Sequence, residues 1–318
     1  MNNSDVGIDS TFLTICIPTY NRREAILDNI KFILNNLSFF NNISFLVIDN
    51  ASEDGTYDAL LKLDLPESFR IEKNLSNIGF FGSFIKSFSI SKSEYILFLS
   101  DEDHLIIREV QSYVMFLKNE RPSFVSPQFF KNNTLYRGKK TRSQIAPKYW
   151  KHAGFYISGL TFSRKESLDI LQRIESFILE KDQYYGHCLL IAEFIVKRSA
   201  YWWDRAVAVK VYKLPSSFAL EQSDSQFNYL PSRWRQHLVT DLFFEYLKTI
   251  HCDEIKIILK MQNAHRDSFF DICKHAISQE APHLIAGFVN GAKKSVSFRE
   301  KFFCFSMSCF SKIKSKFI

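Results

Sequence analysis

The chain has 318 residues, of which 46% are hydrophobic and 24% are charged, so it can form one large domain or two ordinary ones. Its formal net charge is +7, but the excess lies from Lys293 onward and the rest of the chain is close to neutral. A general nucleic-acid binder spreads positive charge over its folded body, and this distribution excludes that class. No apolar run has the length of a membrane span, and the N-terminus lacks the features of a secretory signal, so we expect a cytoplasmic protein.

Two periodicities alternate along residues 13–117. Short apolar runs rich in β-branched and aromatic residues predict strands at 13–18, 43–48, 69–72 and 95–99. Apolar residues at helical spacing predict helices at 23–37, 53–63, 80–90 and 106–117. Ser52 is the expected N-cap of the second helix. The alternation predicts an α/β fold, with a parallel central sheet flanked by helices on both faces.

The rest of the chain changes in character after a Leu-Pro-Ser-Ser segment at 214–217. Before it, the pattern predicts helices at 164–176 and 186–196 and a returning strand at 201–211. After it, amphipathic helices are expected at 234–250, 253–273 and 281–289. We therefore expect three parts, which are a sheet domain at residues 1–214, a helical appendage at 215–292 and a basic amphipathic tail at 293–318.

A polar cluster follows each of the first four predicted strands. The candidate binding residues in these clusters are Pro18, Thr19, Tyr20, Asn21, Arg22, Asp49, Asn50, Ser52, Asn77, Gly79, Asp101, Glu102 and Asp103. Crossovers between parallel strands are right-handed, so the four strands run the same way and the clusters share one edge of the sheet. Ligands of open α/β sheets bind beyond that edge. The sequence therefore predicts a site lined by carboxylates, amides and hydroxyls.

The motifs limit the kind of ligand. The first turn has no G-x-G-x-x-G and the chain has no G-x-x-x-x-G-K-[ST], so neither a dinucleotide fingerprint nor a P-loop is present. Three acidic residues in a row, Asp101 to Asp103, are costly to bury without a counter-charge. Oxygen ligands suit Mg²⁺ or Mn²⁺, which makes Asp101 and Asp103 candidate metal ligands.

Each cluster also has a purely structural interpretation. Residues 100–103 could cap the helix expected from about residue 105, because acids are favoured in the first turn. Asp49 and Asn50 could form an Asx turn, and Asn77 to Gly79 could be an ordinary turn.

The motifs in this order, T-I-C-I-P-T-Y-N-R, F-L-V-I-D-N-A-S-E-D-G-T, N-x-G-F and F-L-S-D-E-D, resemble the family-2 glycosyltransferases of the GT-A fold. The resemblance covers about residues 12–118 and is nearest to bacterial transferases that build O-antigen or capsule repeats. It implies a GT-A type nucleotide-sugar-binding domain. It also implies inverting transfer of a sugar from a nucleoside-diphosphate sugar, with UDP-sugars favoured, to a hydroxyl of a lipid-linked or free glycan.

The resemblance also assigns roles to single positions. Pro18, Thr19 and Asn21 fall where the family holds the nucleoside, and Asp49 falls where a carboxylate reads the base edge, typically uracil N3–H. Residues 101–103 fall on the D-x-D motif. There Asp101 faces the ribose or a metal-bound water, and Asp103 ligates the Mn²⁺ or Mg²⁺ on the diphosphate. Such a cation stabilises the charge of the departing nucleoside diphosphate.

Glycosyl transfer needs a general base on the other face of the sugar. In the family this acid follows an acceptor-binding loop that residues 157–163 resemble, and the next acids here are Glu180 and Asp182. We choose Asp182, although the usual Glu-Asp pair is absent. The Y-Y-G-H segment resembles part of some O-antigen deoxysugar transferases and makes His187 a further candidate. The structural alternatives are a solvated helix acid at 182 and a core histidine at 187.

Three further features bear on partners and specificity. Ser83 stands where the family often has Asn, which concerns the donor-sugar contacts. The stretch from Arg137 to Lys151 is basic and is either a solvated loop or a flap over a diphosphate. The tail at 293–318 mixes Phe with Lys, so we expect it to dock on an anionic membrane at the inner face of the cell membrane, the alternative being a frayed tail.

Two other functions fit parts of the pattern. A sugar-nucleotidyltransferase would have a glycine-rich, basic loop after the first strand, and P-T-Y-N-R is not one. A non-catalytic nucleotide-sugar or glycan-binding module would keep the D-x-D residues and lose the base, which the missing Glu-Asp pair allows.

Overall fold

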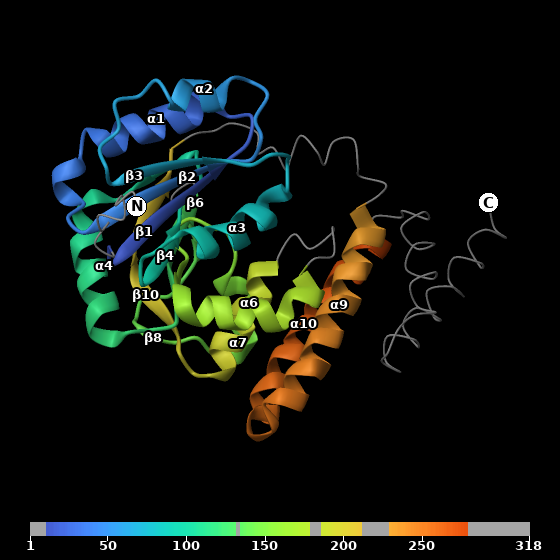
Figure 1. Cartoon of the computed structure of the whole chain (residues 1–318). Coiled ribbons are helices and arrows are strands. Elements are labelled where there is room, and N and C mark those ends of the chain that lie inside the picture. Colours follow the sequence, from blue (N-terminus) through green and yellow to red (C-terminus); the bar gives the residue numbers. More distant parts are fainter. Residues whose placement is uncertain (1–10, 132–133, 179–185, 212–228, 279–318) are drawn as a thin grey trace, which may run out of the picture. The chain divides into compact units, whose positions relative to one another are not determined.

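The structure is a computed structural model that describes residues 11–131, 134–178, 186–211 and 229–278 (Figure 1). These residues form two compact units, which are taken separately below. The first contains every strand and the helices α1 to α7 apart from the end of α6, and the second contains α9 and α10. The helix expected at 281–289 and the tail at 293–318 lie outside the described residues.

The central sheet of the first unit begins with the four expected strands. They are β1 (Leu13–Thr19), β2 (Ile43–Asp49), β3 (Phe69–Lys73) and β4 (Tyr95–Phe98). All three pairings among them are parallel, with β1 between β2 and β4 and with β3 beyond β2. The predicted common direction of these strands is therefore confirmed, and their carboxyl ends share one edge.

The sheet continues with five further strands, and only the last of them falls on a predicted strand, the returning one expected at 201–211. They are β6 (Phe124–Lys131), β7 (Thr134–Arg137), β8 (Ser143–Gln144), β9 (Thr161–Ser163) and β10 (Ala200–Ala206). The order is β3-β2-β1-β4-β9-β6-β10-β8, with β7 paired to β6. Because β9 runs antiparallel to both β4 and β6, the sheet is mixed although mostly parallel.

Helices connect these strands. They are α1 (Arg23–Leu34), α2 (Thr56–Leu60), α3 (Gly79–Ile90), α4 (Ile107–Glu120), α5 (Trp150–Ala153), α6 (Arg164–Ile178) and α7 (Gly186–Val196), with 3-10 turns η1 (Leu37–Phe39) and η2 (Pro147–Tyr149). The α2 helix is shorter than expected, and its N-cap is Gly55 with φ 78°, so the prediction of Ser52 as N-cap is wrong. The Ser52 hydroxyl instead accepts a hydrogen bond from the Asn21 N–H at 2.9 Å.

The two faces of the sheet have separate cores, because side chains alternate along each strand. On one face, Leu13, Ile15 and Ile17 of β1 pack in a core with apolar residues of α1 and α4, such as Ile30 and Val114. Each of these residues is no more than 5% exposed.

The opposite face is aromatic. Phe84 and Phe88 of α3 lie against Phe98 of β4 and Phe162 of β9. The Phe84 and Phe98 rings stack with centroids 4.5 Å apart, and the Phe162 ring meets Phe84 edge-on at 5.5 Å. Helices therefore cover both faces, as the continuous apolar strands predict.

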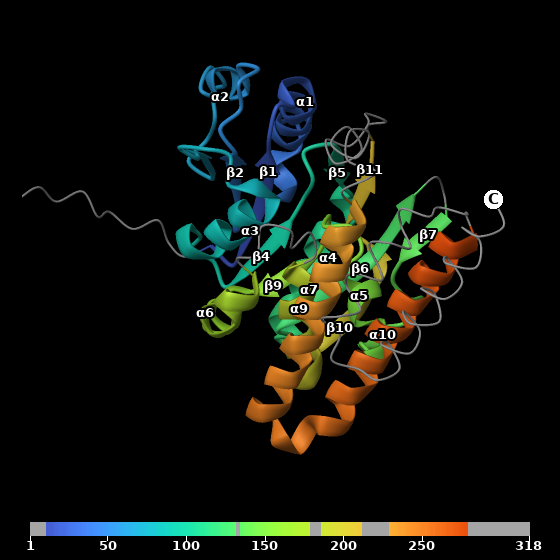
Figure 2. The same ribbon diagram turned by 90° about the vertical axis from the view of Figure 1, so that its right-hand side faces the viewer.

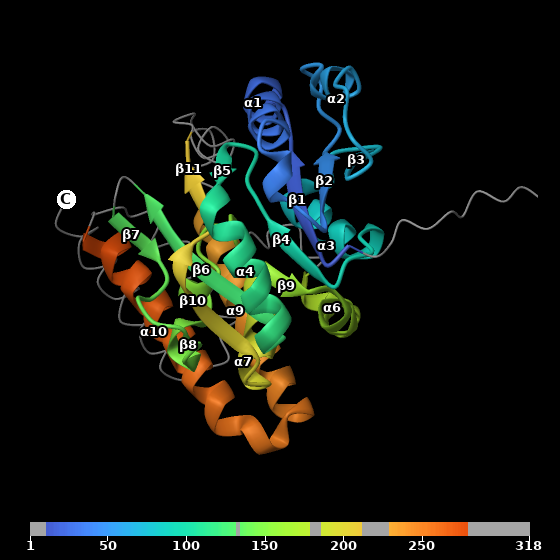
Figure 3. The same cartoon turned by 90° about the vertical axis from the view of Figure 1, so that its left-hand side faces the viewer.

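The returning strand expected at 201–211 is divided in two. After β10, the chain leaves the main sheet at the buried Val207, and β11 (Ala208–Lys210) pairs antiparallel with β5 (Asp103–Leu105). Figure 3 shows this small second sheet beside α1. The division brings Lys210 opposite Asp103, directly after β4.

The second unit is a pair of neighbouring helices, α9 (Tyr229–Ile250) and α10 (Ile255–Ser278), joined through η3 (Cys252–Glu254) (Figure 2). Arg266 forms two hydrogen bonds to the buried Asp241, at 2.9 and 2.7 Å. The Gln262 amide donates to Asp241 and Glu245. Within the described chain, every helix is too short or too polar to cross a membrane.

Candidate active site

Three adjacent carboxylates lie in the turn after β4 and at the first residue of β5. The exposed fractions of Asp101, Glu102 and Asp103 are 4%, 4% and 0%. The helix α4 begins later, at Ile107, and its N-cap Ile106 makes no side-chain cap hydrogen bond. The acids therefore do not cap this helix, and that structural interpretation is wrong. Their burial calls for another explanation, because desolvating three like charges is unfavourable.

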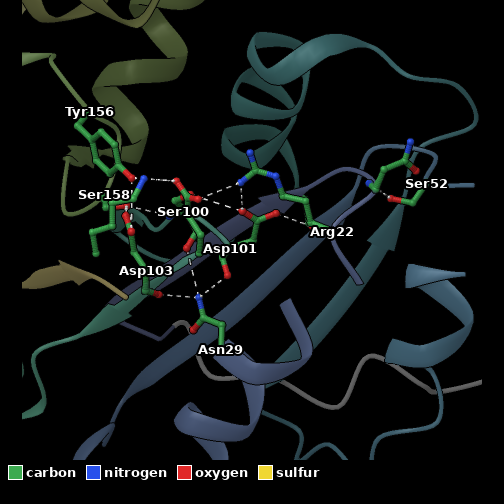
Figure 4. Close-up of polar contacts among 12 residues, drawn as sticks. Arg22, Asn29, Ser52, Ser100, Asp101, Asp103, Tyr156 and Ser158 are labelled. Carbon is green, nitrogen blue, oxygen red and sulfur yellow. Dashed lines mark hydrogen bonds and ion pairs between the residues drawn. The ribbon is translucent and has the colours of Figure 1, made fainter. Parts of the chain in front are cut away.

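Asp101 is held by the turn after β1. The Thr19 hydroxyl donates to Oδ2 at 2.8 Å, and Nη1 of Arg22 donates to Oδ1 at 3.0 Å. Burial raises the pKa of Asp101, while the positive charge of Arg22 and these two hydrogen bonds act in the opposite direction. Figure 4 shows Arg22 reaching across to this carboxylate.

Glu102 is held from the other side. The Lys210 ammonium donates to Oε1 at 3.0 Å, and the Tyr156 hydroxyl donates to the same oxygen at 3.1 Å. Arg22 Nη1 lies 3.7 Å from Oε2. That oxygen is buried and has no hydrogen-bond partner within the part of the chain that the structure describes.

Asp103 is the most buried of the three. The Ser158 hydroxyl donates to Oδ2, and the Tyr156 hydroxyl lies 3.4 Å from Oδ1 (Figure 4). The Ser158 oxygen also accepts a hydrogen bond from the Ser100 N–H at 2.9 Å. Burial raises the pKa of Asp103 to about 7, in spite of the hydrogen bond from Ser158. The protein's own donors therefore do not fully stabilise the charged form of this carboxylate.

One amide fixes the backbone of the same turn. Nδ2 of Asn29, on α1, points at the carbonyl oxygens of Ser100, Asp101 and Asp103 at 3.2, 3.4 and 2.7 Å. Asn29 is fully buried, so these contacts link the position of α1 to the conformation of the turn.

The last residue of β2 provides a fourth buried carboxylate. Asp49 is 0% exposed, and its Oδ2 accepts a hydrogen bond from the Ser52 N–H at 3.1 Å. Its Oδ1 has no hydrogen-bond partner among the described residues. Asn21 connects the turn after β2 to the one after β1, because its Oδ1 accepts a hydrogen bond from the Glu53 N–H at 2.8 Å. The backbone of Asn21 is left-handed, with a φ of 51°.

The loop after β3 joins through amides. Asn50 Nδ2 donates to Asn77 Oδ1 at 2.6 Å, and Asn74 Nδ2 donates to Asn50 Oδ1 at 2.8 Å. Asn77 also receives the N–H of Gly79, whose φ is 74°. Ser83 is buried and accepts a hydrogen bond from Asn74, so it supports this loop from α3.

The structure therefore links the four predicted clusters by hydrogen bonds. Thr19 joins the first cluster to the fourth, Asn21 joins the first to the second, and Asn50 joins the second to the third. Pro18 lies near the end of β1 and Tyr20 in the turn after it, and both are partly exposed. These side chains offer acceptors and hydroxyls suited to a polar ligand, with carboxylates on both sides.

Of the candidates for the general base, only His187 lies in the described part of the chain. Asp182 and its alternative Glu180 lie outside the described residues. His187 is the second residue of α7, is 5% exposed and donates from Nε2 to the carbonyl oxygen of Gly154 at 2.9 Å. Burial lowers the pKa of His187 to about 4, so the imidazole is neutral at physiological pH.

Four residues of this site were missed by sequence reasoning. They are Asn29, Tyr156, Ser158 and Lys210. Tyr156 and Ser158 lie in the loop before β9, and Ser158 falls inside the segment that resembles an acceptor loop. The signal for Lys210 is weaker, since only the pairing of β11 with β5 brings it to Glu102.

The donor set suits a hard cation. The acidic side chains offer oxygen atoms, Glu102 Oε2 lacks a hydrogen-bond partner among the described residues, and burial raises the pKa of both Asp101 and Asp103. Within the described residues, no three His, Cys, Asp or Glu side chains form a cluster that could by itself hold a metal ion. Mg²⁺-type sites often use only one or two carboxylates, with substrate phosphates completing the shell. The residues present fit that second kind of site.

The similarity to known protein families lies mainly in the unit that contains the sheet. Residues 14–177, just over half of the chain, match the model of glycosyl transferase family 2. An uncharacterised glycosyltransferase of Mycoplasma pneumoniae is 24% identical over 162 residues, which are 45% of this chain and 54% of that protein. An abequosyltransferase of Salmonella typhimurium is 31% identical over 97 residues, 29% of this chain and 28% of that protein.

A UDP-Glc:alpha-D-GlcNAc-diphosphoundecaprenol beta-1,3-glucosyltransferase of Escherichia coli is 24% identical over 118 residues, 37% of this chain and 46% of that protein. The chain thus spans about half or less of the length of the curated relatives it matches. Among solved structures, residues 1–349 of S. aureus TarS with UDP align at a TM-score of 0.62 and 13% identity, over 91% of this chain and 82% of that one. This likeness confirms the expected GT-A type fold.

The burial of His187 predicts a pH dependence of stability. Its pKa is about 4 in the fold against a usual 6.5, so the unfolded chain binds the proton between these values and stability falls as the pH drops through them. The effect amounts to at most about 3 kcal/mol. His187→Gln can still donate to Gly154 but cannot titrate, so its free energy of unfolding should fall less steeply with acid. Urea unfolding at several pH values, each referred to the same protein near neutral pH, checks this; parallel curves would contradict it.

Proposed function

Because the chain belongs to glycosyl transferase family 2, we propose that it is an inverting, divalent-metal-dependent glycosyltransferase. It moves a sugar from a nucleoside-diphosphate sugar to a hydroxyl of a lipid-linked glycan in bacterial surface polysaccharide synthesis. The observation that carries the proposal is the set of buried carboxylates at the carboxyl edge of the sheet, with Asp49 on one side and residues 101–103 on the other.

Asp49 supports a nucleotide with a ring N–H. Its Oδ1 is buried without a hydrogen-bond partner among the described residues, and a buried acceptor is stabilised when a ligand supplies a donor. Uracil N3–H is such a donor. One TarS structure contains UDP and another contains UDP-GlcNAc, and the Escherichia coli relative is named for UDP-Glc. We therefore favour a UDP-sugar, with Pro18, Thr19, Tyr20 and Asn21 beside the nucleoside.

Asp103 and Asp101 would hold Mn²⁺ or Mg²⁺, together with the diphosphate of the donor. When bound, the cation supplies Lewis-acid stabilisation of the charge that develops on the departing nucleoside diphosphate. Arg22 and Lys210 reduce the negative charge of the site. They lie within 3.0 Å of Asp101 and Glu102 respectively and offset the negative charge that would otherwise repel an anionic diphosphate.

The acceptor hydroxyl must lose a proton as it attacks the anomeric carbon from the face opposite the diphosphate. We assign that proton to Asp182, with Glu180 and His187 as the alternatives. His187 is neutral at physiological pH, so it could accept a proton, but its burial separates it from bulk water. Attack from the opposite face inverts the anomeric configuration.

The acceptor and the location follow from the relatives and the tail. The Escherichia coli relative is named for a diphosphoundecaprenol-linked sugar, a lipid that lies in the membrane. An O-antigen or capsule precursor of this kind would be reached by an enzyme that is peripheral on the inner face of the cell membrane. The basic, Phe-rich tail at 293–318 supplies the attraction to anionic lipid.

Replacing the buried acid tests the catalytic site. Asp103→Asn removes the charge that pairs with the cation, so sugar transfer should fall by at least about 100-fold. The tightening of nucleoside-diphosphate binding by Mn²⁺, measured by calorimetry, should also be lost. The matched control is Asp58→Asn, which changes an exposed acid on α2 and should leave both values at wild-type levels.

A screen of donors distinguishes a transferase from a non-catalytic binding module. Several nucleotide sugars are screened with Mn²⁺ for an increase in melting temperature and for release of nucleoside diphosphate. Release that Asp103→Asn abolishes supports the transferase. Binding without release, even with acceptor present, would favour a non-catalytic nucleotide-sugar-binding module.

Removal of the proposed base should affect catalysis and leave donor binding intact. Asp182→Asn should keep the dissociation constant of the donor and lower kcat by about 100- to 10,000-fold, because only proton transfer is lost. Glu180→Gln is the matched control and should retain activity. Full activity of Asp182→Asn would remove Asp182 from the mechanism and direct attention to Glu180 and His187.

Truncation tests the membrane proposal. A chain lacking residues 293–318 should no longer co-sediment with vesicles that contain anionic phospholipid, because most of the net positive charge is removed. Zwitterionic vesicles serve as the control, to which the full chain should bind weakly. If the truncated chain binds anionic vesicles as well as the full chain does, the tail is not the membrane anchor.

A further inference from the structure

Arg137 departs most from what its sequence context predicts. It opens the basic stretch that was expected to be a solvated loop or a flap, yet its side chain is 0% exposed. Burial lowers its pKa to about 9, so the guanidinium is still charged at neutral pH. A buried charge is usually paired with an opposite one. Among the described residues, however, none of its donors forms a hydrogen bond with a carboxylate.

The guanidinium is satisfied by four backbone carbonyl oxygens. Nε donates to Pro127 at 3.0 Å, Nη1 donates to Phe155 at 3.1 Å and to Tyr156, and Nη2 donates to Ser158 at 2.8 Å. Three of these four carbonyls belong to the short loop between α5 and β9. The planar fork of arginine can reach them all from one side, which a lysine ammonium cannot do.

This loop carries the two hydroxyls that contact the acidic turn. Tyr156 holds an unusual φ of 64°, and from that conformation its hydroxyl reaches Glu102 and Asp103. Ser158, two residues on, donates to Asp103. A non-glycine residue keeps a positive φ only where its surroundings impose it. Here Arg137 binds the carbonyls of residues 155, 156 and 158, which lie on both sides of that conformation.

The strand that bears Arg137 is also fixed. Gly138, the next residue, has a φ of +111°, and a Cβ atom there would lie 2.7 Å from the Cα of Gln128. Only glycine allows β7 to close so tightly on β6, and this closure directs the Arg137 side chain inward beside Pro127 of β6. The guanidinium is thus anchored on the sheet, and the loop is anchored on the guanidinium.

We propose that Arg137 is a positioning residue for sugar transfer, because it fixes the 155–158 loop so that the Tyr156 and Ser158 hydroxyls orient Glu102 and Asp103. This inference rests on the proposed function of the acidic turn. Arg137 itself touches neither donor nor acceptor in this account. Its effect passes through backbone carbonyls to two hydroxyls and from these to the carboxylates.

The test compares Arg137→Lys with Arg142→Lys. The control makes the same change in the same basic stretch, at a half-exposed side chain that lies over Trp203 and bonds Asp204. Arg137→Lys should lower kcat by about 10- to 100-fold, the scale expected for misplacing a reacting group by about 1 Å. It should also weaken the Mn²⁺-dependent part of nucleoside-diphosphate binding and leave the metal-independent part unchanged. The control should keep the wild-type values.

The route of the effect is tested by combination. The double variant Tyr156→Phe, Ser158→Ala removes both hydroxyls and should show a similar loss in kcat. Adding Arg137→Lys to it should cause little further loss, because residues that act through one another are not additive. A purely structural role would lower the melting temperature and leave kcat of the folded protein unchanged, and that result overturns the proposal.

Two other outcomes are also decisive. If Arg137→Lys does not fold, the double variant alone decides. A double variant with wild-type kcat and wild-type Mn²⁺-dependent binding would show that the two hydroxyls are not needed, and this result overturns the proposal. If the wild-type protein transfers no sugar, the proposed function fails separately. The positioning claim is then decided by the free energies of unfolding, where non-additivity between Arg137→Lys and the double variant supports it and additivity overturns it.

Discussion

The burial of three consecutive carboxylates in one turn is the constraint on which the rest of the site depends. Charged groups lose hydration on burial, and neighbouring acids also repel each other. The fold meets this cost with donors drawn from every side of the turn. Thr19 ends β1 and Arg22 lies in the turn that follows it, Tyr156 and Ser158 come from the loop before β9, and Lys210 comes from β11. These donors do not fully offset the cost of burying the three charges, because the pKa of Asp103 is still raised. A bound cation would be compatible with such a site.

The sheet edge was predictable because its causes are local. Strands and helices in residues 13–117 repeat simple patterns, and a parallel sheet then brings the polar ends of its strands together. The partners of the acids were not predictable in this way. Ser158 is 55 residues from Asp103 and Lys210 is 108 residues from Glu102, so only the tertiary fold brings each pair together.

Where prediction failed, a tertiary contact replaced a local preference. Ser52 has the right chemistry for an N-cap, but its hydroxyl bonds the Asn21 N–H and the helix starts later, after Gly55. The acids before α4 suit a cap equally well, yet they turn inward and Ile106 takes that position. Arg137 lies in a basic stretch, and its burial depends on four carbonyl oxygens that sequence patterns do not reveal.

Asn29 shows how narrow the chemical tolerance of this site is. Its single amide nitrogen faces three carbonyl oxygens in a buried position, and its own carbonyl oxygen has no hydrogen-bond partner among the described residues. An aspartate has nearly the same shape, but it would set an anion against three oxygen acceptors beside three existing acids. Exchanging Asn29 for aspartate would therefore loosen α1 from the acidic turn. The position thus admits a neutral amide and rejects an acid of nearly the same shape.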